Sequence, residues 1–329
     1  MSASAHAPDA VPAVQVLLAT YNGARFLREQ IDSVLEQQGI AVHILARDDG
    51  SGDGTQEVLA EYASALPNRF EVLQDDVRTG TARGNFGLLL QAATGAYAAF
   101  CDQDDLWIPD KLAVSMARML AMEEQHGVQT PLLVYTDLRV VDERLATVSE
   151  SLWQSNSLAQ APRPTLAGLL SENVVTGCSA LLNRALIDRM KTMPATAQMH
   201  DHWAALLASS LGAMTAVPRA TVLYRQHASN VVGAVVGEKS LGQKIGRFVS
   251  EEGVAARRKQ YRADRAQAQS LLELYGAEMT AERRAVVEGF LSMWDLPRIE
   301  RLITTSRLGL WRPDKQRRIA QVIDLLRTK

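Results

Sequence analysis

The sequence predicts an α/β fold, in which a doubly wound, Rossmann-like mixed sheet is flanked by helices and followed by a helical C-terminal appendage. From residue 14 onward, short apolar runs alternate with amphipathic stretches, and this alternation predicts a parallel sheet covered by helices. After residue 233 the strand-like runs stop, and the chain becomes helix-favouring and rich in Arg, Ala and Leu. Because 329 residues exceed the usual size of one hydrophobic core, we expect one large domain with an appendage.

The apolar runs predict strands at residues 14–19, 42–46, 70–73, 96–101, 132–136, 179–182, 213–217 and 221–225. The amphipathic stretches predict helices at residues 24–38, 55–66, 85–93, 109–125, 184–190 and 202–211. In the first helix Leu27, Ile31 and Val34 recur at helical spacing, and Pro109 begins another helix at a favoured position. In such a fold the ends of the strands carry the chemistry.

We divide the chain into a disordered tail at residues 1–13, a catalytic domain at 14–237 and a helical region at 238–329. The tail is small and polar, without the basic start and apolar core of a signal peptide. The formal charge of −2 is unevenly spread: residues 241–329 hold 18 basic and 11 acidic side chains, which is +7 and leaves −9 for the rest. We therefore expect the two parts to meet different partners, with no nucleic acid among them.

The two cysteines, Cys101 and Cys178, each lie in an apolar stretch and lack the spacing of a zinc site or redox pair. Buried, inert thiols in a reducing cytosol are the favoured interpretation. The longest run without charge, residues 84–101, contains Asn, Gln, Thr and three glycines, so it is no transmembrane helix. We expect a cytoplasmic protein, with a peripheral place on the inner face of the cell membrane as an option.

The first motif, Thr20-Tyr21-Asn22-Gly23, follows the first strand. At that edge of an open sheet Tyr21 could stack on a nucleotide base, while the Asn-Gly turn lets the backbone approach a ligand. A strand-to-helix turn with Asn22 as the helix cap explains the same residues equally well.

The second motif runs from Arg47 to Thr55 and contains Asp48, Asp49 and glycines at 50, 52 and 54. This spacing is not the G-x-G-x-x-G of dinucleotide-binding proteins, and two carboxylates would repel a pyrophosphate. We interpret the motif instead as a base-binding turn, in which a carboxylate accepts a hydrogen bond from the ring N–H of uracil or thymine. We favour Asp49 for this role. The alternative is an Asx-rich turn in which Thr55 caps the next helix.

The third motif places Asp102, Gln103, Asp104 and Asp105 directly after an apolar strand. Three carboxylates so close together repel one another unless a cation or hydrogen-bond donors offset their charge. A hard divalent ion, Mg²⁺ or Mn²⁺, is the natural partner, since it takes oxygen ligands and bridges to substrate phosphates. A solvated, helix-capping acidic turn is the weaker alternative.

The fourth constellation combines His200-Asp201-His202-Trp203 with Tyr224-Arg225-Gln226-His227. Asp201 stands where a coil enters a helix, and it could act as general base toward a hydroxyl. Helix capping is an equally good local explanation. His227 is either a surface residue or a late contact to metal or phosphate, and both interpretations stay open.

Read together in order, these motifs and the Gly84-Asn85-Phe86-Gly87 helix start resemble glycosyltransferase family 2, especially its bacterial rhamnosyltransferase-like members of polysaccharide and O-antigen synthesis. The resemblance covers about residues 14–233 and implies a GT-A fold. It implies Asp201 as catalytic base and a divalent metal, Mg²⁺ or Mn²⁺. The donor-binding residues that we assign on this basis are Thr20, Tyr21, Asp49, Arg83, Asn85, Asp102, Gln103, Asp104 and Arg225, and the metal ligands are Asp102, Asp104 and His227.

The resemblance also implies the reaction. Asp201 would take a proton from an acceptor hydroxyl, and the sugar of a nucleotide-diphosphate donor would be transferred with inversion. We expect L-rhamnose or a related deoxysugar from a dTDP- or UDP-sugar, and a saccharide or lipid-linked saccharide as acceptor. The first residue of the family's Glu-Asp pair is His200 here, which is a departure from the pattern. The Gln-x-x-Arg-Trp motif of processive relatives is absent, which implies one sugar per binding event, and residues 226–238 have the composition of a mobile loop.

Two rival functions stay open on the residues alone. A nucleotidyltransferase would need a phosphate-cradling glycine loop after the first strand, where this chain has one glycine. A non-catalytic nucleotide-sugar-binding subunit would need neither Asp104 nor Asp201.

The C-terminal region carries two basic clusters, around Arg257 to Arg265 and at Arg312, Lys315, Arg317 and Arg318. A solvated helical face packed on the core is one interpretation. The other is peripheral contact with an anionic membrane, with apolar contacts supplied by Trp294, Leu308, Leu310 and Trp311.

Overall fold

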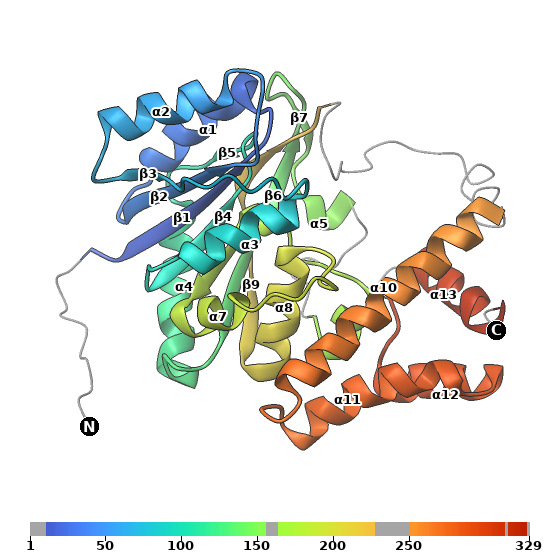
Figure 1. The fold of residues 1–329 in the computed structure, drawn as a ribbon. Helices are drawn as coiled ribbons and strands as arrows, with labels where there is room; N and C mark the ends of the chain where they lie inside the picture. Colours follow the sequence, from blue (N-terminus) through green and yellow to red (C-terminus); the bar gives the residue numbers. More distant parts are fainter. Residues whose placement is uncertain (1–10, 156–163, 228–250, 313–314, 328–329) are drawn as a thin grey trace.

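The computed structural model describes residues 11–155, 164–227, 251–312 and 315–327 (Figure 1). Its strands are β1 (Ala13–Thr20), β2 (Ala41–Asp48), β3 (Phe70–Val72), β4 (Tyr97–Cys101), β5 (Leu106–Trp107), β6 (Leu132–Val141), β7 (Thr147–Ser149), β8 (Ala180–Asn183) and β9 (Ala213–Arg225). They form one mixed sheet in the order β3-β2-β1-β4-β8-β6-β9-β5, with β7 paired to β6. β1 to β4 pair in parallel, β8 is antiparallel to β4 and β6, and β6 runs parallel to β9. The mixed sheet of the predicted fold class is confirmed, but β8 interrupts the parallel sheet that the alternation of strands and helices predicts, because it runs antiparallel to both of its neighbours.

The helices of the sheet domain are α1 (Ala24–Leu35), α2 (Thr55–Ala65), α3 (Ala82–Ala92), α4 (Lys111–His126), α5 (Leu152–Ser155), α6 (Leu166–Ser171), α7 (Arg184–Met190) and α8 (His200–Leu211). Side chains alternate across the strands, so Val16 and Leu18 of β1 enter one core and Leu17 enters the other. Helices α1, α2 and α4 cover the first core, and α3, α6, α7 and α8 cover the second (Figure 1). The sheet is therefore buried on both faces, which explains its continuous apolar runs.

Several predicted boundaries need correction. The two strands predicted at 213–217 and 221–225 are one strand, β9, whose register against β6 shifts around Pro218 because proline cannot donate to the ladder. Helix α3 begins at Ala82 rather than 85, since Thr81 Oγ1 accepts from the Gly84 N–H and caps it. Helix α8 begins at His200 rather than 202. The short elements β5, β7, α5 and α6 were not predicted.

Four C-terminal helices, α10 (Glu251–Tyr275), α11 (Ala281–Ser292), α12 (Arg298–Leu308) and α13 (Lys315–Arg327), pack beside the α3-α6-α7-α8 layer (Figure 1). They share its core through Leu271, Tyr275, Phe290 and Leu310. The predicted boundary at 238, most of the predicted 226–238 loop and most of the predicted tail lie outside the described residues. No helix in the described parts of the chain is long and apolar enough to span a bilayer.

The four apolar residues that we expected on an exposed face of the C-terminal region differ in their burial. Leu310 is fully buried, and Trp294, Leu308 and Trp311 pack against the same core. Their large apolar surfaces stabilise the docking of the C-terminal helices. The exposed apolar side chains of these helices include Ile299 and Ile303 of α12 and Ile319 of α13.

Candidate functional site

The carboxyl ends of β1, β2 and β4 meet at one edge of the sheet. Thr20 at the end of β1 pairs with Asp48 at the end of β2, and Leu18 pairs with Cys101 at the end of β4. The first three sequence motifs follow these strand ends, so the fold brings them together, as an open α/β sheet does for its ligand site.

Gln103 joins the first motif to the third. Its Oε1 accepts from the Tyr21 N–H at 2.8 Å, and its Nε2 donates to the Tyr21 carbonyl at 3.0 Å. A glycine at 23 makes this approach possible, because a Cβ there would lie 2.3 Å from the Gln103 Oε1. Gln103 thus holds the backbone of Tyr21, whose side chain is 58 % exposed and available to a ligand.

Asn22 links the first motif to the second. Its N–H donates to Ser51 Oγ at 2.8 Å, its Oδ1 accepts from the Gly52 N–H at 2.9 Å, and its backbone is left-handed with φ of 50°. The alternative of Asn22 as helix cap is wrong, because α1 is preceded by Gly23 and has no side-chain cap. The two turns therefore form one interlocked unit.

Asp48 organises the second turn. It accepts from the backbone N–H groups of Gly50 and Ser51, from Gln56 and from Thr20 Oγ1. Burial alone would raise its pKa, but hydrogen bonds from Ser51, Gln56 and Thr20 outweigh it and hold the pKa below the ordinary value. Thr20, which we assigned to the donor, is buried and bonded to this carboxylate. Helix α2 begins at Thr55 with Gly54 at the cap position, so the capping alternative for Thr55 is wrong.

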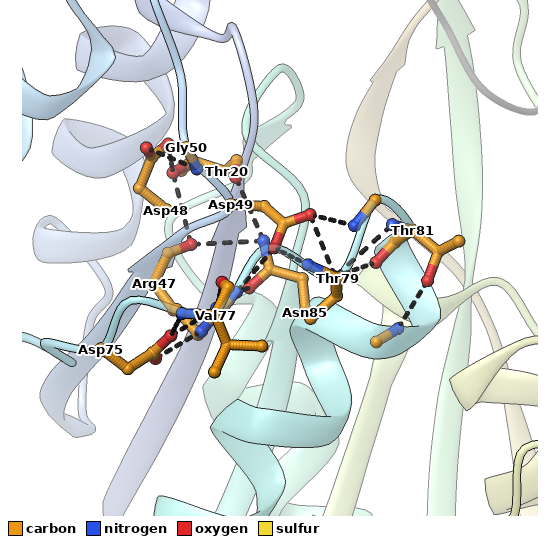
Figure 2. Close-up of polar contacts among 12 residues, drawn as sticks. Thr20, Arg47, Asp48, Asp49, Gly50, Asp75, Val77, Thr79, Thr81 and Asn85 are labelled. Carbon is orange, nitrogen blue, oxygen red and sulfur yellow. Dashed lines mark hydrogen bonds and ion pairs between the residues drawn. The ribbon is translucent and has the colours of Figure 1, made fainter.

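Asp49 is almost completely surrounded by donors from its own chain (Figure 2). Its Oδ1 accepts from Arg47 Nη1 at 3.0 Å and the Thr79 N–H at 2.8 Å. Its Oδ2 accepts from Thr79 Oγ1 at 3.0 Å and the Gly80 N–H at 2.7 Å. Burial is the largest influence on its pKa and would raise it, but these bonds together lower the pKa. Since a carboxylate offers about four acceptor positions, the side chain is ionised and fully engaged.

Arg47 is the centre of this network, and it was not predicted as a site residue. The guanidinium is 1 % exposed, donates to both oxygens of Asp75 at 2.8 and 2.7 Å, and also donates to the Val77 carbonyl. Its Nη1 donates to Asn85 Oδ1 at 3.0 Å, and Asn85 Nδ2 donates to the Thr20 carbonyl at 3.1 Å (Figure 2). Asn85, predicted to touch the donor, is 3 % exposed and connects Arg47 to the carbonyl at the end of β1.

The acidic cluster follows β4. Asp105 is 1 % exposed and accepts from the Arg225 N–H at 3.1 Å, which ties the loop to the end of β9. Burial, together with the negative charges of Asp104 and Asp201, raises the pKa of Asp102 to about 7. Burial and the charges of Asp104 and Asp102 raise the pKa of Asp105 well above its ordinary value. Both carboxyls therefore favour the protonated form unless a cation takes the place of the proton, which is the expected response of a crowded acidic cluster.

His227 lies against this cluster. Its Nε2 is 2.8 Å from Asp104 Oδ2, its side chain is 8 % exposed, and its ring centroid is 5.0 Å from that of Phe26. The structure thus brings together two of the predicted metal ligands, Asp104 and His227, and overturns the alternative of His227 as a surface residue.

Two predicted donor contacts, Arg83 and Arg225, have other partners here. Arg83 Nη1 donates to the carbonyls of Pro194 and Ala195 at 3.3 and 2.9 Å. Arg225 is 2 % exposed, and its Nη2 is 2.6 Å from Glu29 Oε2. Arg83 thus ties α3 to the segment before α8, and Arg225 ties the end of β9 to α1.

One group of side chains in the described residues has the spacing of a metal centre: ligand atoms of Asp102, Asp105 and Cys178 lie within 4.8 Å of one another. Burial and the charges of Asp105 and Asp102 raise the pKa of the Cys178 thiol well above its ordinary value, so it is protonated. A thiol is a poor ligand for Mg²⁺ or Mn²⁺, which prefer carboxylate oxygens. Asp102 and Asp104, with His227 alongside, are the better fit to such an ion.

Asp201 lies in the first turn of α8 and is 8 % exposed. Its Oδ2 accepts from the Gly177 N–H at 3.1 Å, and its Oδ1 accepts from Asn173 Nδ2 at 3.2 Å and the His202 N–H at 2.6 Å. Burial raises its pKa to about 6 against the opposing effect of these bonds. The position before α8 is Met199 and no side chain caps the helix, so the capping alternative for Asp201 is wrong.

His200 is a neutral, buried neighbour of the site. Its ring stacks on Phe86 with 3.9 Å between centroids and meets the edge of Phe100 at 4.6 Å. Burial lowers its pKa to about 3. A Cβ at residue 177 would lie 2.7 Å from His200 Nε2, so glycine there lets the chain reach Asp201 past this ring.

Comparison with known proteins places the chain in a family. Residues 15–190, over half of the chain, match the family described as Glycosyl transferase family 2. The protein therefore belongs to glycosyltransferase family 2 and is a glycosyltransferase. The nucleotidyltransferase and the non-catalytic subunit, the two alternative functions, are wrong. It is 25 % identical over 233 residues to the dTDP-rhamnosyl transferase RfbG of Shigella flexneri, which covers 70 % of this chain and 78 % of that protein. It is 31 % identical over 134 residues to the putative glycosyltransferase EpsE of Bacillus subtilis, which covers 41 % of this chain and 48 % of that protein.

Solved structures support the fold. The S. aureus TarS fragment 1–349 in complex with UDP-GlcNAc superposes with a TM-score of 0.52 at 16 % identity, over 96 % of this chain and 89 % of that one. The mannosyltransferase PcManGT of Pyrobaculum calidifontis in complex with GDP-Man and Mn²⁺ gives 0.52 at 18 % identity, over 97 % and 87 %. The chain has the GT-A fold, as the sequence resemblance implied.

Proposed function

We propose that this enzyme transfers a sugar, with inversion and with a divalent metal, from a nucleotide-diphosphate donor to a hydroxyl of a saccharide acceptor in cell-surface polysaccharide synthesis. The observation that carries the proposal is that Asp201, held by the Gly177 N–H at 3.1 Å, lies close enough to the half-buried Asp102 for its charge to add to burial and to Asp104 in raising the pKa of Asp102. A general base and a donor-binding acidic cluster at one edge of the sheet are what a displacement at a sugar carbon requires.

In this mechanism Asp201 accepts the proton of the acceptor hydroxyl while that oxygen bonds to the anomeric carbon. The bond from that carbon to the diphosphate breaks, the nucleoside diphosphate leaves, and the configuration inverts. Burial makes Asp201 a stronger base than an exposed aspartate, and its bonds to Gly177 and Asn173 fix its direction.

Asp102, Asp104 and His227 would hold Mg²⁺ or Mn²⁺. The crowding of the acidic cluster, in which burial and neighbouring carboxylates raise the pKa of Asp102, and the Asp104–His227 contact support this assignment. Such an ion supplies positive charge that neutralises the departing diphosphate. The Mn²⁺ in the PcManGT structure agrees with this use in a protein of the same fold.

For the donor we propose a dTDP- or UDP-linked L-rhamnose or related deoxysugar. The similarity to the Shigella rhamnosyl transferase supports the sugar and the dTDP, and the UDP-GlcNAc bound to TarS supports the uridine alternative. Tyr21 would stack on the base, and Asp49 would accept its ring N–H in exchange for one of its present hydrogen bonds. Thr20, Arg83, Asn85, Gln103 and Arg225 would support these contacts through the bonds described above.

We place the reaction in the cytoplasm, in agreement with two free, buried cysteines, and propose a saccharide or lipid-linked saccharide as acceptor. Peripheral membrane contact through the basic C-terminal helices is part of this proposal, with the exposed Ile319 as apolar contact in place of the fully buried Leu310. Co-sedimentation with anionic vesicles should show binding at low salt that high salt removes. The variant with Arg312, Lys315, Arg317 and Arg318 replaced by Gln should not bind, and absence of binding by the wild type at low salt would refute membrane contact.

A donor panel tests the function. The enzyme is incubated with dTDP-rhamnose, UDP-sugars and GDP-mannose, with Mg²⁺, Mn²⁺ or a chelator, and with extracted lipid-linked saccharide. We expect nucleotide release that needs metal and acceptor, and a product mass increased by one deoxyhexose. Release from GDP-mannose alone would refute the donor assignment, and undiminished release with a chelator would refute the metal.

A further inference from the structure

The C-terminal helices reach the surroundings of Asp201 by two separate routes. One comes from α10 and meets His202, the residue after Asp201. The other comes from the segment around α13 and meets the chain just before Asn173, which donates to Asp201.

The first route runs through Gln267 of α10, which is 1 % exposed. Its Oε1 accepts from the Gln198 N–H at 2.8 Å, and its Nε2 lies 3.2 Å from His202 Nδ1. His202 Nε2 lies 2.7 Å from the Leu169 carbonyl, which can only accept, so the imidazole carries its proton on Nε2 and Nδ1 accepts from Gln267. Burial lowers the pKa of His202, which keeps it neutral. The ring is therefore fixed at both nitrogens, and its backbone N–H donates to Asp201.

The second route ends at the turn after α6. Arg317 of α13 forms an ion pair with Glu172, and Ser171 Oγ donates to the Leu310 carbonyl at 3.2 Å. Gln321 Nε2 donates to the same carbonyl at 2.8 Å. These contacts fix residues 171 and 172 immediately before Asn173.

We propose that the C-terminal helices belong to the catalytic apparatus, and that Gln267 and Arg317 are positioning residues for Asp201. The proposal rests on the proposed role of Asp201 as base. A base must be held within a fraction of an ångström of its productive place, so loosening its supports lowers the rate of the chemical step. We expect donor binding, which we assign to the strand ends, to be unchanged, because Gln267 and Arg317 contact none of the residues that we assign to the donor in the bonds described above.

Gln267→Met tests the first route, because methionine keeps the volume but has no donor for His202 and no acceptor for Gln198. We expect kcat to fall about tenfold, with the donor Kd and the metal dependence within twofold of wild type. Gln269→Met is the matched control, since Gln269 lies on the exposed side of the same helix and bonds only to Glu273 among the contacts described for it. It should leave kcat unchanged.

Arg317→Met and Arg317→Lys test the second route at a half-exposed position that tolerates change. Methionine should lower kcat severalfold without changing the donor Kd, and lysine, which keeps the charge toward Glu172, should restore most of it. If Gln267→Met does not fold, this pair decides the question. Wild-type kcat in Gln267→Met, or in Arg317→Met, would overturn the corresponding route, and equal losses in kcat and donor affinity would show a merely structural role.

Asp201→Asn, measured in parallel, separates this proposal from the function on which it rests. An inactive Asp201→Asn beside a fully active Gln267→Met and Arg317→Met leaves the base in place and refutes the positioning role. An active Asp201→Asn refutes the base itself.

Discussion

Arg47 Nη1 lies 3.0 Å from Asp49 Oδ1, and both side chains are almost completely removed from water, at 1 % and 5 % exposure. A buried ion pair of this kind gives little net stability in itself, but removing one partner leaves an uncompensated charge in the interior. Asp75 is paired with the same guanidinium and would lose its partner as well.

Arg47→Met should therefore lower the free energy of unfolding by about 3–5 kcal/mol, measured by urea denaturation. Arg28→Met is the matched control, because Arg28 forms an exposed pair with Glu61, and it should leave stability nearly unchanged. Equal stability of the two variants would show that the loop around Asp75 does not depend on Arg47.

Thr79→Val removes one hydroxyl donor from Asp49 and keeps the shape of the side chain. Because all acceptor positions of Asp49 are occupied, a nucleotide N–H can bind only in exchange for one of them. We expect UDP or dTDP to bind severalfold more tightly to the variant, in isothermal titration calorimetry. Weaker binding would show instead that Thr79 holds Asp49 in its receptive position.

Asp104→Ala should abolish transfer and remove metal-dependent donor binding, while the melting temperature stays close to that of the wild type. The physical reason is that Asp104 joins His227 and adds to a repulsive cluster, so its loss costs function more than stability. Asp110→Ala, which removes an exposed carboxylate paired with Arg219, is the control. Full activity of Asp104→Ala would place the metal elsewhere.

Asp201 sets the acidic limit of activity. Its pKa is about 6, and a general base must be ionised, so kcat/KM should fall below about pH 6. Asp201→Asn should lose about 10²–10⁴ in kcat at pH 7.5 and keep its donor affinity, since the amide has the same shape but cannot take the proton. A variant with normal turnover would move the base to another residue.

The same residue predicts a stability effect. Since folding raises the pKa of Asp201 from 3.8 to about 6, the ionised form is disfavoured in the folded state. This cost is absent below pH 3.8, grows between pH 3.8 and 6, and is complete above pH 6, where it amounts to about 3 kcal/mol. The stability of Asp201→Asn relative to wild type should therefore rise between pH 4 and pH 8, by chemical denaturation at each pH. A constant difference would show that Asp201 is not buried in this way.

The strand ends could be predicted from the sequence because apolar runs that stop at polar motifs are local signals. The edge where Tyr21, Asp49 and Asp104 come together follows from that pattern and from the parallel pairing of β1. The antiparallel insertion of β8 could not be predicted, because the apolar run at residues 179–182 does not indicate in which direction it pairs with its neighbours.

The limits at the site have a similar cause. Residue type alone does not say whether Asn85, Arg83 or Arg225 points to a ligand or to another part of the chain, and their partners lie 38 to 196 positions away. Arg47 offered one signal: an arginine at the end of an apolar strand must find anionic partners if it is buried. The sequence around Asp75 and Gln267 gives no such signal, because their partners, Arg47 and His202, come close only when the chain has folded.

Two contacts of the site join residues that are far apart in the sequence. Asp105 and the Arg225 N–H are 120 positions apart, and Gln267 and His202 are 65 positions apart. A ribosome makes the acidic loop early and its partners late. A nascent chain that has not yet reached residue 225 lacks the N–H group that donates to Asp105. A chain that stops before residue 267 lacks the Gln267 contact to His202, the residue after the proposed base Asp201. We therefore expect a chain that ends before α10 to transfer sugar more slowly than the chain with its C-terminal helices, so that activated sugar is used at the full rate only after α10 has been made and has docked.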